Sequence, residues 1–355
     1  MRLLILTQAI DAEDRELGFF IEWVRAFSER FSQVTIIALR VGTYDLPANV
    51  RVVSLGKANR YEREFLMSHA VARVRYLYQL FGYVWRFRNE YDAVYIHQNE
   101  EYAIVSGWLW RLLGKKVSLW RNHYAGSWRT HFAVWSCHIV FCTSRHSYTA
   151  RFNKTVLMPV GVPDRLFFPG GARRPQSVLS LGRITPSKKI DLLLDALAEL
   201  RRAGTMFSAT IAGGVRPEDE VYLEHLRVRA QLLGIEAQVS FVTGVPYAAV
   251  REIFASHEIF VNMSASGMFD KTMFEAMLCE TLVAVCSKDL RTEVDGRYWF
   301  AEGDALGLAR VLTGLLALSP GERDDAGATL RRYALDHHSL SHLAARLSEE
   351  LTRVV

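Results

Sequence analysis

The chain alternates between short apolar runs and longer stretches in which apolar residues recur with helical spacing. Short runs that are apolar on both faces and are separated by helices are typical of parallel sheets built from βαβ units. The pattern therefore predicts an α/β fold. We expect strands in the runs RLLIL, VTIIAL, AVYIH, KVSLW, HIVFC, SVLSL, FSATIA, VSFV, EIFVN and TLVAVC.

The alternation is interrupted once, by the stretch PDRLFFPGGARRPQ, whose Pro, Gly and Arg content is typical of a linker between domains. With 355 residues, the chain is also longer than one hydrophobic core usually supports. We expect two doubly wound parallel-sheet domains, residues 1–165 and 175–337. A final amphipathic helix is expected at about 340–353.

This architecture locates candidate function in the loops that follow the strands. In open parallel sheets, ligands bind beyond the carboxyl ends of the strands, and two such domains that face each other form a cleft. The first loop of the second domain lies in GRITPSKKIDLLLDAL. There we expect Gly182 to allow the turn, a helix to begin near residues 187–188, and Arg183 and Lys188 to bind phosphate beside the helix N-terminus. The alternative is that both cations are solvated loop charges.

A second candidate loop is SASGMFDKTMFEAM, residues 264–277. Asp270 is a natural N-cap, because its short carboxylate can accept hydrogen bonds from the first-turn amides of a helix beginning at Lys271. Glu275 lies a little more than one turn inside this helix, where it can reach the hydroxyls of a ligand whose phosphate rests at the helix start. Alternatively, Asp270 is only a structural cap and Glu275 an exposed helix acid.

Together these two loops resemble the nucleotide-sugar domain of the family 4 glycosyltransferases, which are retaining enzymes of group 1 type with the GT-B fold. Further elements support the resemblance: MPVGVPDRLFF before the linker, IAGG after the second strand of the second domain, and VSFVTGVP after the third. The likeness is clear after residue 155 and looser before it. It implies two facing Rossmann-like domains, with the C-terminal segment 338–355 returning to the first.

The resemblance also implies roles for particular residues. Arg183 and Lys188 would hold the diphosphate in place of a metal ion, and Glu275 would hydrogen-bond the ribose. His123, in KVSLWRNHYAGSW, resembles the family residue that faces the donor sugar; alternatively it is a loop histidine bonded to backbone. The remaining donor-binding residues implied are Gly182, Val245, Pro246, Ser266, Gly267, Met268, Phe269, Asp270, Lys271 and Thr272.

The chain departs from the family pattern at two positions. Gly267 stands where relatives have the first Glu of a Glu-x7-Glu motif, which contacts the donor sugar; Asp270 and Lys271 are candidates to replace that contact. Glu280 stands where relatives have Gly after the helix, a change we interpret as structural.

Composition narrows the function classes. A net charge of +5 without a dense basic run favours anionic ligands over nucleic acid. The four Cys residues have no CxxC or zinc spacing, which indicates thiols in a reducing compartment and no metal site. No apolar stretch is long enough to span a membrane. We expect a cytoplasmic protein.

The segment 60–90 is helical in pattern, rich in aromatic residues and punctuated by arginines. We interpret it mainly as a pair of core helices with Arg stems that reach water. A second interpretation is a peripheral contact with anionic lipid or with a lipid-linked acceptor.

The expected function is transfer of a sugar, with retention, from a UDP- or GDP-linked donor to a hydroxyl of a glycan or lipid-linked acceptor, without a cofactor. Polysaccharide or glycolipid synthesis is the expected setting. Two alternatives remain: a nucleotide-sugar-binding subunit of low activity, and a nucleotide-sugar epimerase of the GT-B fold. A Rossmann oxidoreductase is disfavoured, because no GxGxxG follows the first strand.

Overall fold

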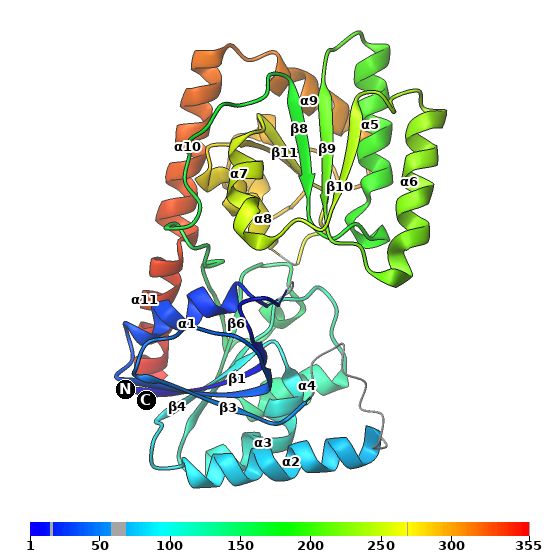
Figure 1. Cartoon of the computed structure of the whole chain (residues 1–355). Helices are drawn as coiled ribbons and strands as arrows, with labels where there is room; N and C mark the ends of the chain where they lie inside the picture. Colours follow the sequence, from blue (N-terminus) through cyan, green and yellow to red (C-terminus); the bar gives the residue numbers. More distant parts are fainter. Residues whose placement is uncertain (15–16, 58–68, 268, 355) are drawn as a thin grey trace. The chain divides into compact units, whose positions relative to one another are not determined.

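The computed structural model describes residues 1–14, 17–57, 69–267 and 269–354 (Figure 1). The chain divides into two compact units. Unit 1 comprises Met1–Gly161 and Leu340–Val355, and unit 2 comprises Val162–Ser339. The chain therefore passes between the units twice, once after residue 161 and once after residue 339.

Unit 1 is built on a parallel sheet of seven strands in the order β3-β2-β1-β4-β5-β6-β7. The chain starts in the middle of the sheet, builds outward to β3, and then returns to place β4 on the other side of β1. The strands are β1 (Arg2–Ile10), β2 (Gln33–Val41), β3 (Val50–Ser54), β4 (Ala93–His97), β5 (Lys116–Trp120), β6 (Ile139–Cys142) and β7 (Thr155–Leu157).

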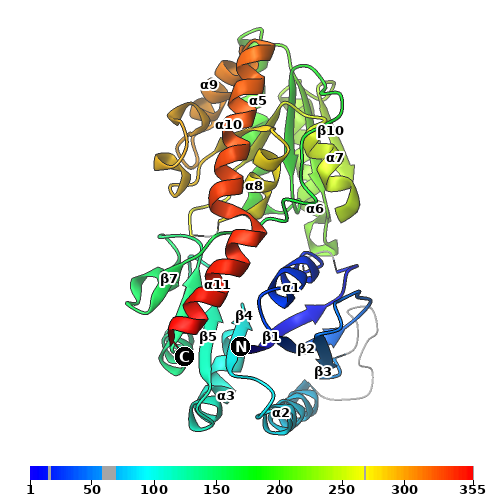
Figure 2. The same ribbon diagram turned by 90° about the vertical axis from the view of Figure 1, so that its left-hand side faces the viewer.

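Two apolar clusters cover the two faces of this sheet. One contains side chains of α1 (Phe20–Ser28) and α11 (Leu340–Val354). The other contains side chains of α2 (His69–Arg86), α3 (Glu100–Leu112) and α4 (Trp128–Ser136). Figure 2 shows α11 and α1 alongside the strands of unit 1. The C-terminal helix is thus part of the core of the N-terminal unit, as the resemblance implied.

Unit 2 has a parallel sheet of five strands in the order β10-β9-β8-β11-β12. Its strands are β8 (Ser177–Leu181), β9 (Ser208–Gly213), β10 (Val239–Thr243), β11 (Ile259–Asn262) and β12 (Leu282–Val285). Its α-helices are α5 (Ile190–Arg202), α6 (Glu220–Leu232), α7 (Val250–Ala255), α8 (Lys271–Leu278), α9 (Ala305–Leu316) and α10 (Pro320–His338).

All ten predicted strands are present, and the α/β fold class is confirmed. Two strands were missed, β3 and β7, which occupy the two edges of the unit 1 sheet. One helix start was placed too early: residues Pro186–Lys188 form a 3-10 turn, Lys189 adopts a left-handed conformation (φ 50°), and α5 begins only at Ile190. Glu280, which replaces the family's Gly, also has a left-handed backbone, with φ 58°. Among the described residues, no helix is long and apolar enough to cross a membrane.

Candidate functional site

The candidate site of unit 2 lies where its sheet changes direction. β8 is flanked by β9 on one side and by β11 on the other, so the loops after β8 and β11 leave the sheet beside each other. Such a switch point is where open parallel sheets bind ligands. A cavity opens there, lined by the ends of β8, β9 and β11 and by Gly182, Arg183, Lys188, Asn262 and Ser264.

Two glycines shape this edge of the sheet. Gly182 donates its backbone N–H to the carbonyl of Ala212 (3.0 Å), and Gly213 lies directly against Gly182. A Cβ on Gly213 would come within 1.6 Å of the Gly182 carbonyl oxygen, and Gly213 has φ 150°. Only glycine fits here without moving the backbone. The IAGG motif therefore sets the shape of the loop that carries Arg183.

Lys188 joins the two predicted loops. Its Nζ donates to the Ser264 hydroxyl (3.0 Å) and forms an ion pair with Asp270 Oδ2 (2.5 Å). The side chains of Lys188 and Asp270 are only 27% and 16% exposed, so this pair is largely shielded from water. Lys188 and Asp270 are 82 residues apart in sequence and meet because β8 and β11 are neighbours.

Asp270 caps α8, as predicted. Its Oδ1 accepts hydrogen bonds from the backbone N–H and the hydroxyl of Thr272 (3.2 and 2.9 Å), and its Oδ2 accepts from Asn262 and Ser264. Burial by itself raises the pKa of Asp270, but the Lys188 ammonium and these hydrogen bonds outweigh burial. The pKa is therefore held well below its ordinary value. Asp270 is a fixed negative charge beside Lys188, Asn262 and Ser264, which line the cavity.

Lys271 and Glu275 follow on α8, four residues apart, and Glu275 is buried (5% exposed). Burial lowers the pKa of Lys271 well below its ordinary value, against the attraction of Glu275 and Asp270. Burial also raises the pKa of Glu275 to about 7, against the attraction of Lys271. The alternative interpretation of Glu275 as an exposed helix acid is therefore wrong.

The other residues predicted from the α8 loop lie as follows. The Ser266 hydroxyl accepts from the backbone N–H of Lys288 (2.9 Å), and Gly267 has φ 95°. The Phe269 ring is buried, packed edge-on against Phe274. Met268 lies outside the described residues. Val245 and Pro246 follow β10, two strands away from β8 at the same sheet edge, and neither lines the cavity.

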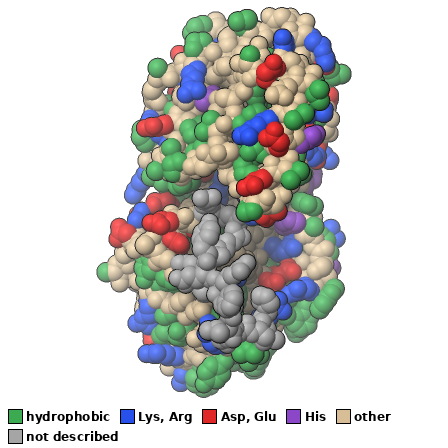
Figure 3. All heavy atoms as spheres, turned by 45° about the vertical axis from the view of Figure 1, so that its right-hand side comes forward, with side chains coloured by type: hydrophobic (Ala, Val, Ile, Leu, Met, Phe, Trp, Pro, Cys, Tyr) green, Lys and Arg blue, Asp and Glu red, His purple; other side chains and the backbone are tan. Residues whose placement is uncertain are grey.

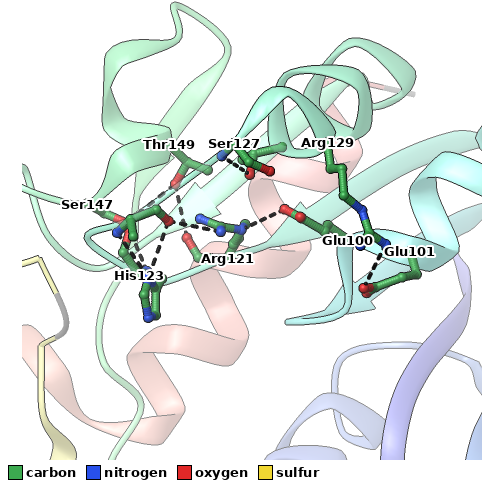
Figure 4. A network of polar contacts seen from close by, with 10 residues as sticks. Glu100, Glu101, Arg121, His123, Ser127, Arg129, Ser147 and Thr149 are labelled. Carbon is green, nitrogen blue, oxygen red and sulfur yellow. Dashed lines mark hydrogen bonds and ion pairs between the residues drawn. The ribbon is translucent and has the colours of Figure 1, made fainter. Parts of the chain in front are cut away.

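His123 belongs to unit 1, in the loop after β5 (Figure 4). Its Nδ1 lies 2.9 Å from the Ala125 amide nitrogen and 3.2 Å from the Ala125 carbonyl oxygen, so the Ala125 backbone holds the ring. The backbone of His123 is held by Ser147, whose hydroxyl bonds both its N–H and its carbonyl. Figure 4 shows the ring pointing away from the rest of this network. The Nε2 atom of His123 takes no part in these contacts.

The same network contains an ion pair that the sequence did not indicate. Arg121 Nε lies 2.8 Å from Glu100 Oε2, and Arg121 Nη2 donates to the Ala125 carbonyl (2.9 Å). Ala125 is the residue whose amide fixes the His123 ring, so this ion pair supports the His123 loop. In unit 2, sequence reasoning missed Asn262 and Ser264, which bind Asp270 and line the cavity. The available signal was their polarity, Asn262 at the last position of a buried strand and Ser264 just after it.

Comparisons with known proteins agree with this architecture. Residues 175–317, which include every predicted site residue of unit 2, match the family model described as glycosyl transferases group 1. Over 308 residues, or 77% of this chain and 75% of the relative, the chain is 24% identical to a GDP-mannose:cellobiosyl-diphosphopolyprenol alpha-mannosyltransferase of Komagataeibacter xylinus. A second relative is a GDP-mannose-dependent phosphatidylinositol monomannoside mannosyltransferase of Mycolicibacterium smegmatis, 27% identical over 49% of this chain and 47% of the relative.

Solved structures show the same fold over the full length. Anabaena HepE in complex with UDP superposes with a TM-score of 0.77 at 16% identity, covering 99% of this chain and 100% of HepE. Sucrose-phosphate synthase of Thermosynechococcus elongatus also gives a TM-score of 0.77 at 16% identity, covering 100% and 99% of the two chains. Residues 175–317 therefore match the group 1 glycosyl transferases, and the chain has the GT-B fold of these structures.

Proposed function

We propose that this chain transfers a sugar from a nucleoside-diphosphate sugar to a hydroxyl acceptor with retention of anomeric configuration and without a metal ion. The observation that carries the proposal is the meeting of the β8 and β11 loops at Lys188, beside the start of α8. Relatives named for GDP-mannose and a structural neighbour bound to UDP support a donor of this class. Both UDP- and GDP-linked sugars fit the proposal.

The chemical demand of this reaction is the departure of the nucleoside diphosphate, on which negative charge develops as the glycosidic bond breaks. Lys188 and Arg183 supply positive charge at the cavity, and the positive end of the α8 helix dipole begins beside Lys188. In this proposal Glu275 binds the ribose hydroxyls, and the His123 imidazole contacts the donor sugar. A front-face retaining reaction needs no separate general base, in keeping with the absence of one from these assignments.

The test compares cation variants at one loop. Arg183→Ala and Lys188→Gln should each lower the rate of transfer about 100-fold, because each removes a charge that stabilises the leaving group, ~3 kcal/mol. Lys189→Gln is the matched control: Lys189 is the next residue, but its ammonium pairs with Glu302 (2.7 Å) outside the cavity. The donor is first chosen by thermal shift with UDP, GDP, ADP and their sugars. Unchanged turnover in Lys188→Gln would contradict the proposal.

The finer parts of the proposal have their own measurements. Retention is read from the anomeric signal of the product by NMR, and metal independence from turnover in excess chelator.

Gly267, in place of the acid that relatives place near the sugar, favours one other candidate, a nucleotide-binding subunit of low activity. Nucleotide binding without turnover by the purified chain would support that candidate. Release of an altered free sugar would instead support an epimerase.

We also propose a cytoplasmic location, with peripheral contact at the inner membrane face. The four cysteines are buried free thiols, and burial raises the pKa of Cys137 and Cys279 to about 12, so neither is a reactive thiolate. This chemistry suits a reducing compartment. The membrane contact follows from a surface of unit 1.

A further inference from the structure

Unit 1 carries an unusual concentration of exposed apolar side chains on one layer of helices. The helices α2, α3 and α4 pack on the same face of the sheet, so their outer sides form one surface, called here the α2–α4 face. Ten of the twenty-two large hydrophobic side chains exposed among the described residues lie on it. They are Val71, Val74, Leu77, Tyr78, Trp85, Trp108, Leu112, Trp128, Phe132 and Trp135.

Tryptophan dominates this surface. The four Trp side chains exposed in the described part of the chain are all among the ten, with exposed fractions between 53% (Trp108) and 77% (Trp128). The patch is continuous across the helices: the Trp108 ring lies 6.3 Å from Phe81 of α2, and Arg111 of α3 donates to the Trp135 carbonyl of α4 (3.1 Å). Exposed apolar area of this extent on a folded protein marks an interaction surface.

The charges on this face are predominantly positive. Helix α2 contains Arg73, Arg75 and Arg86 and no acid, and α3 contains Arg111. The two acids of α3 are already neutralised, Glu100 by Arg121 and Glu101 by Arg129. Figure 3 shows green hydrophobic and blue basic side chains near one another on the part of the visible surface that belongs to unit 1.

Arginines and aromatic rings are also paired locally. The Arg88 guanidinium lies 4.5 Å from the centre of the Trp85 ring, and that of Arg111 lies 6.0 Å from the Trp135 ring. Trp is amphipathic and settles at the level of lipid headgroups, while Arg stems cover apolar surface and keep their charge at the phosphates. This combination matches the interface of an anionic bilayer.

We infer that the α2–α4 face docks unit 1 on an anionic lipid bilayer. The inference specifies the surface that makes the proposed peripheral membrane contact, and it rests on that part of the proposed function. A second copy of the chain is a poorer occupant, because symmetric pairing of this face would bring the arginines of α2 close to their own copies. A bilayer instead supplies apolar depth for the rings and anions for every arginine.

The test is co-sedimentation of the full chain with vesicles of phosphatidylcholine alone and of phosphatidylcholine with about 30 mol% phosphatidylglycerol. The chain should bind the anionic vesicles more tightly, and added salt should weaken binding. Arg73→Glu should weaken it at least about five-fold. The double variant Trp85→Ser/Trp135→Ser should weaken it further, and because both side chains are more than half exposed, the fold should be retained.

Matched controls come from unit 2. Val221→Ser/Leu232→Ser removes two apolar side chains that are each 82% exposed on α6, and Arg332→Glu reverses an exposed charge on α10. Both controls should bind vesicles like the unaltered chain. No binding to anionic vesicles, or equal losses in the control variants, would overturn the inference, as would a dimer in solution that the Trp variants dissociate. Thermal shift by UDP or GDP reports the donor site separately, so loss of one result does not imply loss of the other.

Discussion

At the scale of single residues, two anionic groups compete for the ammonium of Lys188. It contacts Asp270, and in the proposed function it also holds the diphosphate of the donor. Because Asp270 stays ionised, its ion pair with Lys188 persists when the pH changes near neutrality. Donor affinity at this lysine therefore measures the difference between the two partners, not the full strength of one ion pair.

Glu275 predicts a pH dependence of nucleotide binding. Its pKa is raised to about 7, so the carboxyl gains its charge as pH rises from 6 to 8. A carboxylate accepts hydrogen bonds from ribose hydroxyls better than the protonated acid does. The affinity for UDP or GDP should therefore increase about five- to ten-fold between pH 6 and pH 8, measured by calorimetry.

Glu275→Gln serves as the control, because it keeps the shape of the side chain and removes the titration. The phosphates of the nucleotide titrate equally in both proteins, so the difference between them isolates Glu275. Stability gives an independent check. A raised pKa contributes stability below about pH 4.5 that is lost as pH rises through 7, so the unaltered chain should lose stability relative to Glu275→Gln over that interval. Stability curves that run parallel in the two proteins would contradict the raised pKa of Glu275. Nucleotide affinities with the same pH dependence in both would place the ribose site elsewhere.

Sequence reasoning identified the ions of the site but not their contacts. Arg183 and Lys188 were recognisable because they follow a buried strand, and Asp270 because it precedes a helix. The bonds from Asn262 and Ser264 to Asp270 depend on side-chain directions in a loop that has no regular period. The Arg121–Glu100 ion pair joins the loop after β5 to the first residue of α3 in the same way. Such contacts depend on the order of the strands in the sheet, which the local pattern of apolar and polar residues does not predict.

At the scale of elements, the close approach of β8 and β9 predicts a sharp contrast between neighbouring glycines. Gly213→Ala should lower the free energy of unfolding by more than about 2 kcal/mol, because its Cβ would collide with the Gly182 backbone. Nucleotide affinity should fall with it, since Gly182 precedes Arg183. Gly214→Ala is the control: a Cβ there meets nothing within 4 Å. Chemical denaturation would show the contrast, and equal effects at the two positions would contradict it.

The strands that were missed show which elements periodicity fails to reveal. The ten predicted strands are apolar runs, and most are interior to a sheet. β3 is short and lies at an edge, and its residues range from half-buried to exposed. Its sequence VRVVS therefore shows little contrast between buried apolar and exposed polar positions. β7 has only three residues. The helix boundary at Ile190 was misjudged because Lys189 turns left-handed, a choice that the composition of the loop does not dictate.

At the scale of the whole molecule, the stability of unit 1 should depend on the last helix of the chain. Leu343, Leu347 and Leu351 of α11 are fully buried in the cluster that also contains Trp23 and Phe27 of α1. Leu347→Ala should cost about 2–5 kcal/mol of unfolding free energy. Leu306→Ala on α9, where the side chain is 60% exposed, should change it by less than about 0.5 kcal/mol. Similar costs for both variants would contradict the role of α11.

The placement of α11 also has a consequence for biosynthesis. The first 161 residues leave the ribosome well before the leucines that complete their hydrophobic core, whereas all of unit 2 emerges between them. Unit 2 can therefore reach its native packing while unit 1 still waits for its final helix. The half of the protein that is made first is the half that finishes folding last.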